Sequence, residues 1–431
     1  MTKRFFIATL FIMLTQSLFG QDISTPTDSI AAYFNEIKVA AKEHQSLWTK
    51  DLYGPILLVN PITRQIFANA PDSAGALILS NKIYTGILPK EISFANTSIK
   101  WNGIDWAMII LPLPTDKQDR INLLAHELFH VSQPALGFKL SNHDNNHLDQ
   151  KDGRIYLRLE LEALIKALQT TNGPERKTHL TNALTFREYR YSLYPDAKDT
   201  ENSLELNEGL AEYTGLLISS RNYTQAIEHL IQNIRMFINN PTFVRSFAYQ
   251  TIPVYGYLLD NISKGWNKQI SVKTNLTDYF IRAFDLSLPN DLKKSSGSIL
   301  KQYNGDMIVA EEKTREEKTK TLIAEYKNKF ITLPHLDIAF EKMNITFDPR
   351  NIMPVEDKGT VYPNIRVTDN WGILTVTNGA LMSPRWDKIS VTPPVKIEKK
   401  SISGEGWTLE LNEGYSLVKD ESTGIYKLIK K

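Results

Sequence analysis

The chain has 431 residues, of which 42% are hydrophobic, so it can bury a sizeable core and is long enough for two or three domains. Lys and Arg total 50 and Asp and Glu total 48, which gives a formal net charge of +2 at neutral pH. This balance disfavours a nucleic-acid-binding protein and a protein that binds anionic membranes. The absence of cysteine excludes disulfide bonds and a lipid anchor attached through cysteine.

Residues 1–20 have the pattern of a secretory signal peptide. Lys3 and Arg4 precede an apolar run that ends near Phe19, and Gly20 places a small residue where cleavage would occur. The run is about 15 residues long and falls short of the ~20 that a membrane-spanning helix needs, so an uncleaved anchor is the less favoured alternative. The sequence therefore predicts an exported protein, periplasmic or secreted, with no membrane span in the mature chain.

Residues 21–115 are predicted to form a helix followed by a small mixed β-sheet. Apolar residues from Asp28 to Glu43 fall at helical spacing, and short β-rich runs separated by Pro, Asn and Gly come next. In TSIKWNGIDWAMIILPLP, Asn102 and Gly103 lie between two apolar stretches, which is the pattern of a tight β-hairpin.

Residues 116–343 are predicted to be mainly helical. Thr115 and Gln118 have the spacing of a capping box at the start of a helix that runs through HELFHVSQ. Helical patterns continue to about Lys329, and the charged run AEEKTREEKTKTLIAEYKNKF is typical of a solvent-exposed helix face. Residues 344–431 alternate apolar and polar side chains and predict a separate β-rich domain. The expected fold class is α+β.

His126, Glu127 and His130 form HELFH, which fits the pattern H-E-x-x-H. Two histidines four residues apart share one face of a helix, so both rings can bind one zinc ion while the glutamate projects beside them. The opposite flank carries a predicted buried stripe, formed by Ile121, Leu124, Ala125 and Leu128. The alternative is a pair of hydrogen-bonded core histidines with no metal. This alternative is disfavoured, because a glutamate buried between them would carry a desolvation cost that a cation largely cancels.

A catalytic zinc site normally has three protein ligands. The hexapeptide LELNEG occurs twice and offers Glu208 and Glu413 as candidates for the third. Glu208 lies in a helical pattern where the small Gly209 and Gly215 would let another helix approach closely. Glu413 lies in Asn412–Gly414, between strand patterns, where a solvent-facing hairpin turn is expected. The sequence therefore favours Glu208 as the third ligand.

Other acidic residues and histidines are secondary candidates. Glu212, one turn further along, is predicted to accept the free ring N–H of a ligating histidine, with an ordinary surface carboxylate as the alternative. Glu160 and Glu162 remain alternative third ligands, but small residues do not surround them. His143 and His147 repeat the four-residue spacing in a polar stretch that favours a solvated loop over a second metal site.

At these residues the sequence resembles the thermolysin-like gluzincins, and LNEGLAEY is similar to the LNEGFA-type segment of the aminopeptidase N family. The resemblance covers about residues 97–260. It implies a zincin-like catalytic domain with one zinc ion (Zn²⁺) per chain, His126, His130 and Glu208 as ligands, and Glu127 as general base. The chain departs from the pattern because 77 residues separate His130 from Glu208, far more than in those families, so an inserted helical segment must fill the interval.

A tyrosine on a helix after the third ligand stabilises the oxyanion in the aminopeptidase N family. Tyr249, in YQTIPV, is similar in placement but lacks the Lys and Gly that accompany the family's tyrosine. Tyr255 and Tyr257 are alternates, and core tyrosines without a catalytic role fit the sequence equally well. Pro253 is predicted to kink this helix if the helix continues past it.

The combined prediction is an exported zinc metallopeptidase whose partner is a peptide or protein substrate. The strand WAMIILPL before the zinc helix is predicted either to bind an extended peptide at a sheet edge or to be part of the core. A GAMEN-like motif is absent, so exopeptidase activity is not implied. Two alternatives stay open, namely a non-catalytic envelope or secreted binding protein with a structural or vestigial zinc site, and a zinc hydrolase acting on another amide. The retention of Glu127 disfavours the first alternative.

Overall fold

The computed structural model describes residues 27–138, 145–348 and 351–430, so the predicted signal peptide and His143 lie outside the described residues. The chain divides into two compact units. The larger unit contains the described residues up to Pro89 together with Asn96–Lys313, and the smaller contains Lys90–Ala95 and the chain from Thr314 onward. None of the described helices is both long and apolar enough to cross a membrane.

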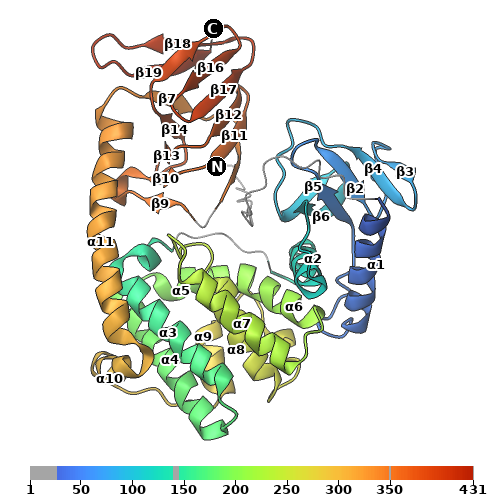
Figure 1. The fold of residues 1–431 in the computed structure, drawn as a ribbon, viewed down its shortest axis with the longest axis vertical. Coiled ribbons are helices and arrows are strands. Elements are labelled where there is room, and N and C mark those ends of the chain that lie inside the picture. The colour runs from blue at the N-terminus through green and yellow to red at the C-terminus, as the bar shows by residue number, and fades with distance from the viewer. Residues whose placement is uncertain (1–26, 139–144, 349–350, 431) are drawn as a thin grey trace. The chain divides into compact units, whose positions relative to one another are not determined.

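In the larger unit, strands of the described region form a mixed sheet in the order β3-β4-β2-β1-β6-β5 (Figure 1). Neighbouring strands are antiparallel except β1 and β6, which run parallel. The strands are β1 (Ile56–Val59), β2 (Gln65–Ala68), β3 (Ile78–Ser80), β4 (Ile83–Ile87), β5 (Thr97–Trp101) and β6 (Ile104–Ile110). The predicted small mixed sheet is therefore confirmed.

The predicted hairpin joins β5 to β6. Asn102 and Gly103 have φ angles of 46° and 79°, and a type I′ turn needs positive φ at both of its central residues. Strand β6 pairs with β1 on one side and β5 on the other, so it has no free edge. The prediction that this strand binds a peptide at a sheet edge is therefore wrong. Its assignment to the core is confirmed, because the side chains from Trp106 to Ile109 are fully buried.

Helix α1 (Thr27–Glu43) precedes the sheet, and helix α2 (Lys117–Ser132) packs against β5, β6 and α6. The cap of α2 is Asp116, whose side chain accepts the backbone N–H of Asp119, so the predicted capping box at Thr115 is wrong by one residue. The Asp116 carboxylate thus satisfies one of the N–H groups that the first turn of a helix leaves without an intrahelical partner. The predicted apolar stripe of α2 is confirmed as buried, at Ile121, Leu124, Ala125 and Leu128.

Helices dominate the rest of the larger unit, as predicted (Figure 1). Helices α3 and α4 pack along each other, and α6 packs against both α2 and α8. The α-helices are α3 (Lys151–Gln169), α4 (Gly173–Leu193), α5 (Ala197–Leu204), α6 (Leu210–Ile218), α7 (Tyr223–Phe237), α8 (Ala248–Asp260), α9 (Leu276–Ala283), α10 (Leu292–Ile299) and α11 (Gly305–Lys327). Helix α11 begins in the larger unit and continues into the smaller one. Short turns of 3₁₀ helix are η1 (Asn146–Asp149), η3 (Trp266–Gln269) and η4 (Leu300–Tyr303), and a turn of π-helix is η2 (Glu205–Gly209). A second π turn, η5 (Asn328–Thr332), lies in the smaller unit.

The smaller unit holds two sheets, which confirms a β-rich C-terminal region and an α+β fold. Their strand orders are β18-β19-β7-β14-β13-β10-β9 and β15-β16-β17-β12-β11-β8. Phe347 in one sheet packs against Tyr362 in the other, with their ring centroids 4.8 Å apart. The elements are β7 (Leu336–Ala339), β8 (Asn344–Phe347), β9 (Met353–Pro354), η6 (Glu356–Lys358), β10 (Thr360–Tyr362), β11 (Ile365–Asp369), β12 (Gly372–Val376), β13 (Ala380–Met382), β14 (Lys388–Val391), β15 (Pro394–Ile397), β16 (Ser401–Gly404), β17 (Trp407–Leu411), β18 (Tyr415–Lys419) and β19 (Tyr426–Lys430).

The second copy of LELNEG lies between β17 and β18. Trp407, Leu409 and Leu411 are buried alternately along β17, as predicted. Strand β18 pairs with β19 in the other sheet, so the turn at Asn412–Gly414 connects two sheets and the predicted hairpin is wrong. The side chain of Glu413 is 88% exposed and lies 3.3 Å from Lys400. A carboxylate so exposed is a surface group, in contrast to its counterpart in the first copy.

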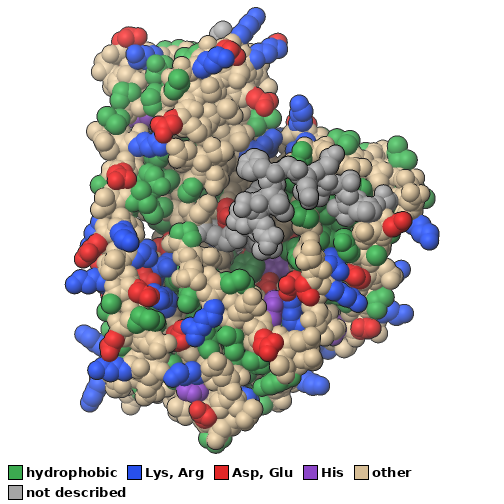
Figure 2. All heavy atoms as spheres, viewed as in Figure 1, with side chains coloured by type: hydrophobic (Ala, Val, Ile, Leu, Met, Phe, Trp, Pro, Cys, Tyr) green, Lys and Arg blue, Asp and Glu red, His purple; other side chains and the backbone are tan. Residues whose placement is uncertain are grey.

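Side chains of both charge signs are interspersed over the face of the molecule seen in Figure 2. This distribution agrees with the formal net charge of +2. An extended area of one sign is the feature that draws nucleic acid to a protein surface. The visible face does not present one.

Candidate metal centre

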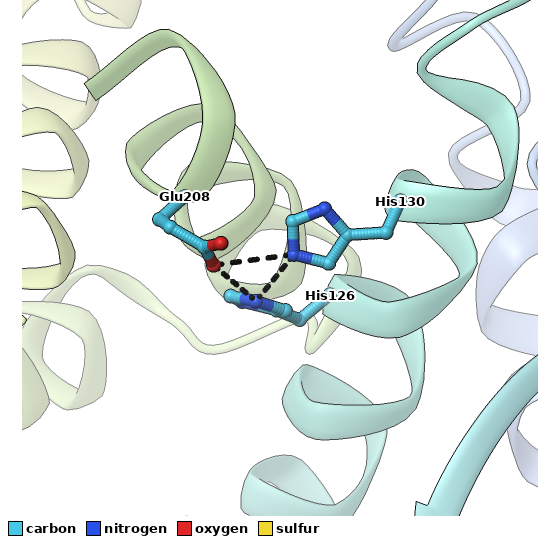
Figure 3. A group of neighbouring side chains, drawn as sticks. All are labelled: His126, His130 and Glu208. Atoms are coloured by element: carbon cyan, nitrogen blue, oxygen red, sulfur yellow. Dashed lines mark hydrogen bonds and ion pairs between the residues drawn. The ribbon is translucent and has the colours of Figure 1, made fainter. Parts of the chain in front are cut away.

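His126, His130 and Glu208 point toward one another from two helical runs (Figure 3). His126 Nε2 lies 3.1 Å from His130 Nε2, and Glu208 Oε2 lies 3.5 Å and 3.2 Å from these two nitrogens. Ligand atoms bound at 2.0–2.2 Å to one tetrahedral ion are about 3.3 Å apart. The three side chains have this spacing, so the group could hold a metal ion.

The outward nitrogen of each histidine has an acceptor. His126 Nδ1 donates to Glu212 Oε2 at 2.9 Å, the contact predicted for Glu212. His130 Nδ1 donates to Gln133 Oε1 at 2.8 Å. Because a carboxylate and an amide oxygen can only accept, each Nδ1 carries the ring proton, and each Nε2 of a neutral ring presents a lone pair. Two nitrogen lone pairs and a carboxylate oxygen thus converge on one point, which favours a cation there.

The charges around this point are arranged for a positive group. Burial lowers the pKa of His126, but hydrogen bonds with Glu208 and Glu212 outweigh it and raise the pKa to about 10. Burial raises the pKa of Glu208, but the charges of His130 and His126 hold it well below its usual range. The carboxylate of Glu208 therefore stays ionised, and the site holds either protons or a metal ion on its histidines.

A wider helical turn orients Glu208. The chain from α5 to α6 is continuous, but the N–H of Leu210 bonds to the carbonyl of Glu205, five residues back, and forms the π turn η2. In a regular helix Glu201, Glu205, Glu208 and Glu212 would lie along one stripe. Here the first two bond to buried arginines and the last two to histidines, and the π turn between them provides the change of direction.

Glycines let three helices pack closely around Glu208, as the sequence predicts. A Cβ on Gly209 would lie 2.6 Å from Cγ1 of Ile252 on α8. A Cβ on Gly215 would lie 2.6 Å from the carbonyl oxygen of Asn122 on α2. Neither space accepts a side chain without movement of a neighbouring helix, so the run from α5 to α6 is held between α2 and α8.

Glu127 is the unusual group of the site. Its side chain is 1% exposed, and neither carboxylate oxygen has a hydrogen-bond partner among the described residues. Burial raises its pKa to about 7, although His126 and His130 act in the opposite direction. Burying a carboxylate without a hydrogen-bond partner lowers the free energy of unfolding. Groups kept in this condition are candidates for function.

Tyr249, on the first turn of α8, lies against the site. Its hydroxyl donates to Glu208 Oε2 at 2.5 Å, and its ring stacks on that of His126 with centroids 5.3 Å apart. Helix α8 continues through Pro253. The alternate tyrosines lie elsewhere, because Tyr255 donates to Glu160 and Tyr257 lies near the ring of Tyr223.

The alternative third ligands belong to other clusters. Glu162 pairs with Arg235, and neither it nor Glu160 belongs to the group that could hold a metal. Glu160 is fully buried and accepts hydrogen bonds from three buried side chains, Arg187, Arg190 and Tyr255. Paired with two guanidinium groups, its charge is already compensated.

His147 lies in η1, where its Nε2 is 2.7 Å from Oε1 of the fully buried Glu201. The predicted solvated loop is therefore wrong for His147, because a buried carboxylate requires donors and this ring supplies one. The sequence did not indicate a role for Gln133, nor the buried cluster in which Arg187 and Arg190 bond to glutamates. Spacing of three residues from His130 on one helix was the available signal for Gln133.

The site draws all its residues from the larger unit. Helix α2 supplies both histidines and Glu127, and its C-cap residue is Gln133. The run from α5 to α6 supplies Glu208 and Glu212, and α8 supplies Tyr249. A scan against protein-family models and searches of curated proteins and of solved structures found no match for this chain.

Proposed function

We propose that this protein is an exported zinc metallopeptidase with a zincin-like catalytic domain. The observation that carries the proposal is the pairing of a three-atom metal-binding group with a buried carboxylate that has no partner, Glu127. A structural metal site needs its ligands and their supports. It has no use for an additional buried carboxylate, which makes the unpartnered Glu127 costly unless it takes part in a reaction.

The donor set supports zinc. Two imidazole nitrogens and one carboxylate oxygen from His126, His130 and Glu208 form the His₂Glu set of catalytic zinc sites, which leave one position open. When bound there, zinc would supply a water with a pKa near ~7 and polarise a substrate carbonyl. The ring orientations needed for this are already held by Glu212 and Gln133.

Glu127 would accept the proton of the attacking water and pass it to the leaving amine. Its place next to His126 on α2 puts the carboxylate beside the histidine ligands, and no described residue bonds to either of its oxygens. The hydroxyl of Tyr249 would donate a hydrogen bond to the oxyanion that forms on the substrate. Burial and the neighbouring Glu208 raise the pKa of Tyr249 well above its usual value, so the hydroxyl keeps its proton at neutral pH.

The peptide substrate, the zincin-like fold and export rest on the sequence. HELFH and LNEGLAEY resemble gluzincin segments, and residues 1–20 have the pattern of a signal peptide. Hydrolysis of another amide would use the same groups. A screen of peptide libraries beside other amides separates these two substrate classes.

The repeated hexapeptide supplies the matched pair for the first test. Metal content is measured by mass spectrometry on purified mature wild type, Glu208→Ala and Glu413→Ala. We expect one zinc ion per chain in wild type and Glu413→Ala, and a loss in Glu208→Ala, because only Glu208 lies with the histidines. Wild type that binds no zinc after reconstitution contradicts the proposal. Zinc binding without hydrolysis of any substrate favours the binding-protein alternative.

A further inference from the structure

We infer that Gln133 is a positioning residue that links His130 to the π turn carrying Glu208, so that one side chain sets the relative placement of two metal ligands. The inference rests on the proposed metal site and adds a residue to it. Gln133 follows α2 directly as its C-cap residue and is 5% exposed.

The amide of Gln133 bridges the two ligand-bearing elements. Its Oε1 accepts the N–H of His130 Nδ1 at 2.8 Å. Its Nε2 donates to the backbone carbonyl of Asn207 at 2.8 Å and approaches that of Leu206 at 3.4 Å. Asn207 immediately precedes Glu208, so the contact reaches the backbone of the third ligand.

These contacts allow only one orientation of the amide. Backbone carbonyls accept but never donate, so the NH₂ group of Gln133 must face Leu206 and Asn207. The amide oxygen then faces the ring, and His130 must carry its proton on Nδ1. The lone pair of His130 Nε2 is thereby directed at the point where His126 and Glu208 converge.

The π turn explains why the carbonyl of Leu206 is open to a donor from outside the helix. In a regular α-helix the N–H of Leu210 would bond to the carbonyl of Leu206, but here it bonds to Glu205. The wider turn that directs Glu208 toward the histidines therefore releases a buried carbonyl, and Gln133 approaches it. Burial of an unpaired carbonyl is costly, so the amide stabilises the turn while it orients the ring.

The two histidines thus have different supports. His126 donates to a carboxylate, Glu212, and His130 donates to a neutral amide. The neutral partner adds no further negative charge beside Glu127, Glu208 and Glu212. It also supplies the N–H that bonds to the carbonyl of Asn207, a donor that a carboxylate lacks.

The test compares Gln133→Leu, Gln133→Glu and Gln118→Leu with wild type. Gln118→Leu is the matched control, because Gln118 lies at the other end of α2, where its partly exposed amide donates to Gln225 and not to the metal site. Zinc affinity is measured by competition with a chromophoric chelator, and the visible absorption of the Co²⁺-substituted protein reports ligand geometry. Thermal unfolding of the metal-free proteins reports folding separately.

We expect Gln133→Leu to bind zinc about 10- to 100-fold more weakly and to change the Co²⁺ spectrum, since loss of a ligand's hydrogen-bond partner has effects of this size. Gln118→Leu should match wild type. Gln133→Glu keeps an oxygen that accepts the His130 N–H but loses the N–H that bonds to the carbonyl of Asn207, so its zinc affinity should lie between those of Gln133→Leu and wild type. It also carries the test if Gln133→Leu does not fold.

Two results would overturn the inference while leaving the proposed function intact: a Gln133→Leu protein within twofold of the Gln118→Leu control, or a Gln133→Glu protein that binds zinc as tightly as wild type. Wild type that binds neither zinc nor cobalt would overturn the proposed function and this inference together. The two failures are therefore distinguishable in one set of measurements.

Discussion

The hydroxyl of Tyr249 donates a hydrogen bond to Glu208 while its ring stacks on His126, with 8° between the two ring planes. One side chain from α8 thus contacts two of the three proposed metal ligands. The contact with Glu208 occupies the hydroxyl in the absence of substrate. Oxyanion stabilisation would require the same hydroxyl to donate to the substrate.

Tyr249→Phe separates these two uses of the hydroxyl. It keeps the ring stacked on His126 and removes the donor. If the hydroxyl stabilises the oxyanion, kcat should fall about 10²- to 10³-fold, with KM changed much less. Zinc affinity should fall by less than tenfold, because Glu208 keeps its place near the histidines. Steady-state kinetics and chelator competition measure both effects, and a loss of activity explained entirely by lost zinc would refute the catalytic role.

Glu127→Gln should retain zinc and lose activity. The amide has nearly the shape of the carboxylate but cannot accept a proton, so kcat should fall about 10²- to 10⁴-fold. Glu413→Gln is the matched control, because the side chain of Glu413 is exposed and solvated by water. Zinc content and hydrolysis of the best library substrate are measured on the same preparations. Activity within a few fold of wild type would rule out Glu127 as the base.

Gly215→Ala tests the close packing of α6 on α2. The new methyl group would lie 2.6 Å from the carbonyl oxygen of Asn122, so the helices must separate. We expect destabilisation of about 1–3 kcal/mol together with weaker zinc binding, since Asn122 also donates to Glu212. Gly297→Ala in α10 is the control, because nothing lies within 4 Å of its Cβ position, and it should stabilise by about 1 kcal/mol or less. Urea unfolding measures both, and equal effects would contradict the packing argument.

Glu201→Gln tests the buried charge cluster beneath the site. Burial alone would raise the pKa of Glu201, but Arg190 and a hydrogen bond from His147 lower it to about 2. A depressed carboxyl pKa stabilises the fold above about pH 4.5, and this stabilisation is lost as pH falls through about 2. The free energy of unfolding of wild type should therefore exceed that of Glu201→Gln by about 3 kcal/mol at pH 7. Unfolding measured from pH 7 to pH 2 should show the difference shrinking, and a constant difference would refute the coupling.

Local patterns predicted much of what surrounds the site. The type I′ turn at Asn102 and Gly103 and the buried stripe of α2 follow from φ preferences and helical period alone. The choice of Glu208 over Glu413 also followed from neighbours in the chain, since small residues flank the first and strand patterns the second. Each of these depends on hydrogen bonds or steric contacts within a few residues.

Other features escaped local patterns because their partners are distant in sequence. Glu160 had the helical context of a ligand, yet it bonds to Arg187 and Arg190 in a buried cluster. Strand β6 looked suitable for an edge, yet β1 pairs with it, and Ile56 of β1 lies opposite Ala107 of β6, 51 positions later in the chain. The pattern of residues along the chain does not reveal which charged side chains form ion pairs inside the protein, or which strands have neighbours on both edges.

The sequence by itself determined that His126 and His130 share a helix face with Glu127 beside them, because a period of 3.6 residues is a property of any α-helix. Only the tertiary structure decided that Glu208 reaches this face across 77 intervening residues, that a π turn directs it, and that Gln133 connects that turn to His130. A helical period is enforced by backbone hydrogen bonds four residues apart. A metal-binding group requires three atoms within a few ångströms, and only the packing of the run from η2 to α6 between α2 and α8 brings them together.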